Sequence, residues 1–259
     1  MLAFVGCDES NDFVPEIAQA QQAGFQVFTG SGAANVQAAI NAFQALIGGA
    51  NNASTAGSQA TGFRSINWDA GIVPVEPAAF PFDFFNNANT SPATRGLIVG
   101  AGGNQLRASN NAFANLNADY PNQFTPFSAN NLFAATSSRI LWARFEIPGA
   151  TGVPAAVTGF GAVFSDVDNA GTTTVEYFNG NTSLGVFQVP TRSDANGHSF
   201  LGVVFTNGSK ITSVKITQGD AAMGVTAAAG PNDVSNGGTQ DIVVVDDFFY
   251  GEPRVVGTP

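Results

Sequence analysis

Alternation of apolar and polar side chains predicts β-strands along much of the chain, most clearly in residues 155–189. Residues 157–164 are apolar on both alternating faces, which predicts a strand buried on both sides. Residues 172–178 alternate between their two faces, and residues 184–189 run back after Asn179-Gly180, a pair that favours a tight turn. We therefore expect a buried strand followed by a hairpin.

Segment 138–147 has one apolar face and one mixed face. The apolar face consists of Leu141, Ala143, Phe145 and Ile147, and the mixed face of Ile140, Trp142, Arg144 and Glu146. Only the first set suits a core, so we expect Trp142 on an accessible face, beside Arg144 and Glu146 as ligand-binding partners. The alternative is that the N-terminal helix covers Trp142.

Further short strands are predicted, several of them separated by turn-forming residues. They fall at residues 64–68, 96–99, 105–109, 199–206, 211–217 and 241–250, with weaker candidates at 82–85 and 112–116. Short strands without helices between them are typical of an all-β fold. We therefore predict an antiparallel two-sheet sandwich of jelly-roll type.

One amphipathic helix is expected before the strands. Residues 32–47 carry an apolar stripe of Val36, Ile40, Phe43 and Ile47, and two glycines follow. Residues 51–62 are mostly small and polar, as in a linker. We accordingly divide the chain into an N-terminal arm, residues 1–61, and a β-sandwich domain, residues 62–259.

Composition narrows the classes of partner. Of the 259 residues 44% are hydrophobic and only 11% are charged, and the net charge is −10. The nine basic residues form no cluster, which argues against nucleic-acid binding and against an anionic membrane surface. An acidic balance suits calcium or neutral partners such as glycans, and this composition is common in surface-exposed microbial proteins.

Cys7 is the only cysteine, so an intrachain disulfide is impossible. Phe4-Val5-Gly6-Cys7 resembles the end of a bacterial lipoprotein signal, in which a small residue precedes the cysteine that becomes acylated. The resemblance implies lipidation of Cys7, and it is the only membrane attachment that the sequence suggests. The alternative is an ordinary N-terminus with a free thiol.

Two groups of aspartates are candidate metal ligands. Asp166 and Asp168 follow the buried strand, and Asp246 and Asp247 follow three valines on the last strand. Adjacent strand residues face opposite ways, so at least one of the last two carboxylates points inward, where an unpaired charge is costly. Calcium prefers such oxygen ligands, although turn capping by aspartate is the alternative.

Catalytic patterns are weak in this sequence. His198 is the only histidine, and no Gly-x-Ser-x-Gly motif accompanies it. Hydrolysis of glycosides needs two carboxylates in one cleft, and no motif marks such a pair here. The sequence favours a non-enzymatic protein over a hydrolase without deciding between them.

Four segments carry a resemblance to known proteins. They are residues 66–69 (INWD), 159–168 (GFGAVFSDVD), 200–203 (FLGV) and 245–251 (VDDFFYG). Together they resemble uncharacterised secreted bacterial β-sandwich proteins and, more loosely, carbohydrate-binding modules of jelly-roll type. The looser resemblance implies a structural calcium that joins the first and last strands, through Asp69 and Asp246 or Asp247.

We therefore expect an exported, non-enzymatic β-sandwich on the cell surface or outside a bacterium. It would bind glycan or extracellular matrix and hold calcium as a structural ion. A subunit that self-assembles into an extracellular layer or filament is the alternative, because low charge and a helical arm suit subunit packing.

Overall fold

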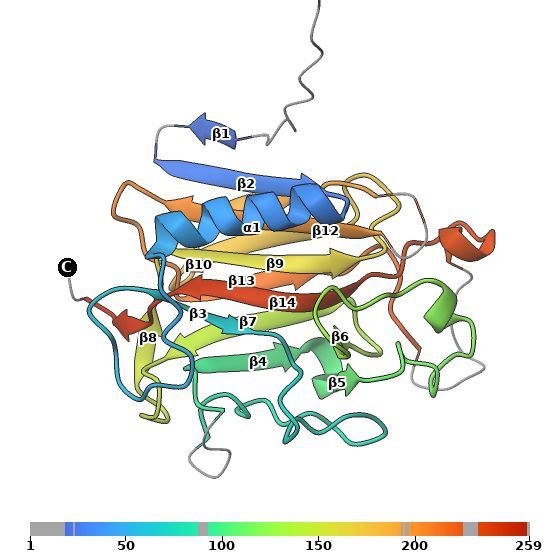
Figure 1. Cartoon of the computed structure of the whole chain (residues 1–259), viewed down its shortest axis with the longest axis horizontal. Coiled ribbons are helices and arrows are strands. Elements are labelled where there is room, and N and C mark those ends of the chain that lie inside the picture. Colours follow the sequence, from blue (N-terminus) through green and yellow to red (C-terminus); the bar gives the residue numbers. More distant parts are fainter. Residues whose placement is uncertain are drawn as a thin grey trace, which may run out of the picture.

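The structure is a computed structural model that describes residues 19–22, 24–87, 93–192, 194, 197–224 and 233–257. It contains two antiparallel β-sheets (Figure 1). The first sheet has the order β1 (Gln19–Gln22), β2 (Phe25–Ser31), β12 (His198–Phe205), β9 (Gly159–Ser165), β14 (Val244–Gly251), β6 (Leu132–Ala135) and β5 (Leu106–Ser109), and β3 (Phe63–Ile66) also pairs with β14. The second sheet has the order β11 (Thr182–Gln188), β10 (Thr174–Asn179), β13 (Ser213–Thr217), β7 (Ile140–Glu146), β8 (Pro154–Ala156) and β15 (Arg254–Val255), and β4 (Leu97–Ala101) also pairs with β7. The predicted all-β two-sheet sandwich is thus confirmed.

The main core lies between the two sheets and is rich in aromatic rings. All seven residues of β9 are buried, as expected for a strand with apolar side chains on both faces. Trp68 is 1% exposed and stacks on Phe133, with the ring centroids 3.8 Å apart and the planes 3° from parallel. Its indole Nε1 donates to the Asp246 carbonyl oxygen at 2.7 Å, which satisfies its one polar atom.

The helix α1 (Ala33–Ile47) covers the outer face of the first sheet, as Figure 1 shows across β2 and β12. The predicted stripe is buried there against Phe28, Val163, Phe200, Val204 and Phe249. Gly48, at φ 133°, ends the helix. Because this packing is on the first sheet, the helix does not cover Trp142, which belongs to β7 of the second sheet.

Residues 25–62 are tied to the sandwich at several points. The strand β2 pairs with β12 from Phe25 to Ser31. Arg64 and Glu252 form a fully buried ion pair at 2.6 Å. Arg64 Nη1 also donates to the carbonyl oxygens of Ala53 and Thr55, in the segment that the sequence presents as a linker. The domain boundary at residue 62 stays a prediction. Release of the N-terminal arm after cleavage at this boundary would require these contacts to break.

Two weaker strand predictions are wrong. Residues 82–86 and 112–116 form turns. Ala112 and Phe113 have φ values of 52° and 60°, outside the extended region, and the Ser109 hydroxyl accepts the Phe113 N–H at 2.7 Å. Phe113 is nevertheless fully buried, so an apolar residue at this position indicates packing in a turn and not a strand.

Among the described helices, none has the length and apolarity needed to cross a bilayer. Cys7 lies outside the described residues.

Candidate functional site

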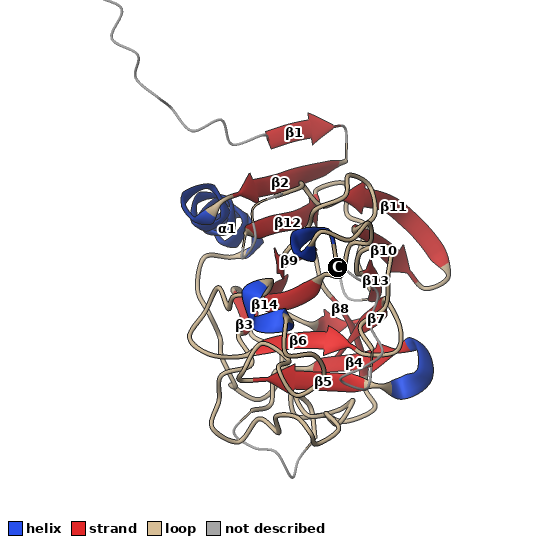
Figure 2. Ribbon diagram, turned by 90° about the vertical axis from the view of Figure 1, so that its right-hand side faces the viewer, coloured by secondary structure: helices blue, strands red, loops and turns tan. Residues whose placement is uncertain are grey.

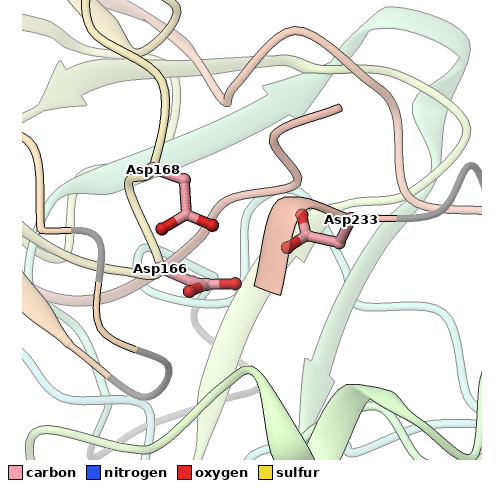
Figure 3. A group of neighbouring side chains, drawn as sticks. All are labelled: Asp166, Asp168 and Asp233. Atoms are coloured by element: carbon pink, nitrogen blue, oxygen red, sulfur yellow. The ribbon is translucent and has the colours of Figure 1, made fainter. Parts of the chain in front are cut away.

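Three carboxylates converge beyond the end of β9 (Figure 3). Asp166 follows the last residue of β9 in a left-handed backbone conformation, at φ 68°, and Asp168 follows two residues later. Asp233 comes from a distant segment and precedes the 3-10 helix Val234–Asn236. One carboxylate oxygen from each of the three lies within 4.8 Å of the other two.

The donors around this carboxylate triad do not satisfy it. The Ser235 hydroxyl lies 3.0 Å from Asp166 Oδ1 and 3.1 Å from Asp168 Oδ2, but it has only one proton to donate. Asp166 Oδ2 and Asp168 Oδ1 are buried without a hydrogen-bond partner among the described residues. Burial first, and then the charges of Asp233 and Asp168, raise the pKa of Asp166 to about 8. These oxygens could hold a metal ion, which would replace the missing donors.

Asp241 fixes the loop that carries two of these ligands. Its carboxylate accepts the backbone N–H groups of Asp168 and Asn169, each at 3.2 Å, and the Thr172 hydroxyl at 2.6 Å. Burial is the main cause that raises the pKa of Asp241 to about 6. The sequence pattern indicated neither Asp233 nor Asp241 as a site residue. They lie more than sixty residues beyond Asp168, at the end of a low-complexity segment that offers no periodic pattern.

The second predicted group, Asp69, Asp246 and Asp247, also comes together. A bulge in β14 explains how adjacent aspartates share one environment. Val245 pairs with Phe164 and Phe248 with Ala162, so two residues of β14 lie opposite one residue of β9. At least one of the two carboxylates was expected to point inward, and both are buried. Both contact Ser128, so the premise that adjacent residues face opposite ways fails at the bulge.

Ser128 and its neighbours supply donors to this second group. The Ser128 hydroxyl lies 2.6 Å from Asp247 Oδ1, 3.1 Å from Asp69 Oδ2 and 3.3 Å from Asp246 Oδ1. Asp69 Oδ1 accepts the N–H groups of Asn130 and Asn131 at 3.0 and 2.9 Å. Burial raises the pKa of Asp246, and the neighbouring charge of Asp247 raises it further. Backbone N–H groups of Phe127 and Ser128 also donate to Asp246 Oδ2. No buried oxygen of this group lacks a hydrogen-bond partner among the described residues, in contrast to the triad.

Trp142 lies on the outer face of the second sheet and is 38% exposed, as the alternation predicts. Its pairing partner on β4 is Gly100, which has no side chain to cover the indole. On the other side the ring of Phe178 lies 5.7 Å from that of Trp142. Trp142 and Phe82, which is 59% exposed, line a cavity of about 580 Å³ together with Arg144. The result is a groove with exposed aromatic rings, which we call the Trp142 groove.

The two charged residues predicted beside Trp142 lie in different environments. Arg144 lines the groove, and its side chain is 61% exposed. Glu146 is 7% exposed, and its Oε2 accepts the Asn86 side-chain N–H and the Gly152 backbone N–H, each at 2.9 Å. The expected exposure of Glu146 is therefore wrong, because its carboxylate closes the turn that follows β7.

His198, the single histidine, is bound to the backbone. Its Nε2 lies 2.8 Å from the Thr125 carbonyl oxygen, and burial lowers the pKa of the imidazole.

Comparison of the chain with models of known protein families and with curated protein sequences finds no match. The carboxylate triad and the Trp142 groove are therefore the features of the described residues that indicate a function.

Proposed function

We propose that this chain is a non-enzymatic β-sandwich that binds a glycan, free or as part of an extracellular matrix, in the Trp142 groove. The observation that carries the proposal is the position of Trp142, an exposed indole opposite a glycine, in a cavity that also contains Phe82 and Arg144. The flat C–H face of a pyranose packs on such a ring, and neighbouring polar groups bind its hydroxyls. At about 580 Å³ the cavity is in the size range of small-ligand sites.

The carboxylate triad of Asp166, Asp168 and Asp233 completes the proposal as a structural calcium site. All candidate ligands are oxygens, which favours a hard cation over zinc or copper. An ion there would join the loop after β9 to the segment that leads into β14, so its role is to stabilise the sandwich. Asp69, Asp246 and Asp247, the other predicted ligands, are the competing site.

Location outside the cell is part of the same proposal. The low charge and acidic balance of the chain support it, as does the lipoprotein-like sequence before Cys7. Radiolabelled fatty acid in the producing bacterium, with a Cys7→Ser variant as control, tests the lipid attachment.

A glycan array probed with the purified protein tests the binding function. We expect binding to a defined group of sugars, and we expect Trp142→Ala to abolish it. Ile72→Ala is the matched control, because Ile72 is 51% exposed and does not line the groove. If Trp142→Ala binds as well as the unchanged protein, the groove is not the binding site.

Self-assembly into a layer or filament is the second candidate function, and the edge strand β11 favours it. Among the described strands β11 pairs with β10 alone, and it lies at the margin of the molecule in Figure 2. It contains neither charge nor proline, and its Val186 is 58% exposed. An exposed edge strand without charged residues or proline can pair with a strand of a second molecule. Polymers seen by electron microscopy, and lost in Val186→Lys, would favour assembly, whereas a monomer at high concentration would refute it.

A further inference from the structure

Two of the nine basic residues of this acidic chain lie beside Trp142. Arg144 is two residues further along β7, which puts it on the same face of the strand. Lys215 on β13 is directly paired with Trp142. The net charge of the chain is −10, so positive charge at the groove contrasts with the rest of the molecule.

Arg144 has donors to spare for a ligand. Its closest acidic atom is Glu146 Oε1, 3.9 Å from Nη2, which is too far for a hydrogen bond. The other oxygen of Glu146 is occupied by Asn86 and Gly152. Glu146 therefore lies near the guanidinium without using its N–H groups. No side-chain hydrogen bond joins Arg144 to another of the residues that the structure describes.

Lys215 is less available than Arg144. Its Nζ lies 3.4 Å from Glu176 Oε2, and its side chain is 33% exposed. Glu176 therefore offsets much of this charge, and Lys215 adds to the field around Trp142 without being the main contact. The residue that faces the cavity with a free planar set of donors is Arg144.

We infer that the Trp142 groove selects acidic saccharides, such as uronic-acid polymers, over neutral ones. This inference rests on the proposed glycan-binding function and names the class of glycan. The sugar ring packs on the indole, and its carboxylate accepts two parallel hydrogen bonds from the Arg144 guanidinium, a geometry that arginine matches better than lysine. Because the molecule as a whole repels anions, this local contact supplies the selectivity.

Polygalacturonate and its fully methyl-esterified form provide matched probes, because they share one backbone and differ in charge. We expect the acidic polymer to bind about tenfold more tightly in low salt, and we expect added salt to reduce that advantage. Arg144→Gln should remove the preference while retaining weak binding to both polymers. Lys210→Gln is the control, since it removes the same charge from a residue that lines a different cavity.

Equal affinity for the two polymers, or a preference for the ester, would overturn the inference and leave the glycan-binding function standing. An acidic preference that persists in Arg144→Gln would overturn the assigned contact. If neither polymer binds and an array of neutral and acidic sugars also gives nothing, both the inference and the proposed function fail.

Discussion

At the residue scale, the two tryptophans of this chain differ in almost every physical respect. Trp68 is 1% exposed, stacked on Phe133 and hydrogen-bonded through its indole nitrogen. Trp142 is 38% exposed and contacts the ring of Phe178. Its indole nitrogen forms no hydrogen bond with another described residue. A tryptophan that is not needed for the core is therefore available for binding.

Substitution of each tryptophan separates these roles. Trp68→Ala should lower the free energy of unfolding by ~3–5 kcal/mol, the usual cost of truncating a buried large aromatic residue. Trp142→Ala should cost less, about 1–2 kcal/mol, because Trp142 is 38% exposed and so loses less buried area than Trp68. Urea unfolding followed by circular dichroism measures both. A loss of several kcal/mol in Trp142→Ala would show that the residue is structural, and it would contradict the binding role.

The buried aspartates predict an unusual pH dependence. Burial and the charge of Asp247 raise the pKa of Asp246 above its unfolded value, so the folded protein keeps a proton that the unfolded chain has lost. Both states are protonated at low pH. Above the unfolded pKa of about 4, stability should then fall as pH rises, by at most ~1.4 kcal/mol per pH unit for each such group, until the folded pKa is passed.

Asp246→Asn tests this dependence because the amide resembles the protonated carboxyl group. The variant should flatten the fall in unfolding midpoint between about pH 5 and pH 8, measured in the presence of a chelator. Asp119→Asn is a suitable control, since Asp119 is exposed and forms no hydrogen bond with Asp69, Asp246 or Asp247. An unchanged slope in Asp246→Asn would mean that Asp246 is ionised in the folded state.

At the same scale, the sequence allowed part of the site to be predicted. Asp166 and Asp168 stand out because they follow a strand whose burial is evident from its apolar residues. Asp233 could not be found, since only the tertiary fold brings it to them. The convergence of Asp246 and Asp247 was hidden for another reason. It requires a bulge, which interrupts an alternation, but β14 is buried on both faces and has no alternation in which the interruption would be visible.

At the scale of elements, the docking of α1 depends on glycines in the sheet beneath it. A Cβ on Gly202 of β12 would lie 2.7 Å from Phe43 Cδ2 and 2.9 Å from Phe200 Cζ. Phe43 is fully buried between Phe28 and Phe200, so it has little room to move. The absence of a side chain at position 202 is therefore what lets the helix approach the sheet closely.

Gly202→Ala should lower the free energy of unfolding by ~1–3 kcal/mol through overpacking. The backbone at Gly202 is not in the left-handed region, so the effect is steric. Gly71→Ala is the control, because a Cβ there meets no atom within 4 Å. Thermal unfolding of the two variants provides the comparison. Equal midpoints would show that the helix is loosely packed on the sheet.

The elements that could be predicted were those in which burial follows the local period. The stripe of α1 and the alternation in β7 as far as Phe145 are examples, and both were confirmed. The strand β2 was missed, because its seven residues include glycine, two hydroxyl residues and a glutamine, although Gly24 before it and Gly32 after it have positive φ. Its pairing with β12 comes from tertiary structure, which a local pattern does not report.

At the scale of the whole molecule, the two aspartate clusters connect parts of the chain that are distant in sequence. The triad joins the loop after β9 to the segment before β14. The second cluster joins the residues after β3 to the segment at Ser128 and to β14 itself. Either cluster could transmit the effect of a bound cation to global stability, and their chemistry indicates which one does. The triad has unpartnered buried oxygens, whereas in the second cluster Ser128 and backbone N–H groups already occupy the carboxylates.

Thermal melts with calcium and with EDTA decide between the clusters. Calcium at a hundredfold excess over its Kd stabilises the folded state by ~2.7 kcal/mol, which should raise the melting temperature by several degrees. Asp168→Asn should remove this rise, whereas Asp69→Asn should retain it. The rise should also be larger at pH 8 than at pH 5, because calcium must displace the proton that Asp166 holds with a pKa of about 8. Identical melts with and without calcium, together with no metal by elemental analysis, would mean that a proton alone occupies the triad.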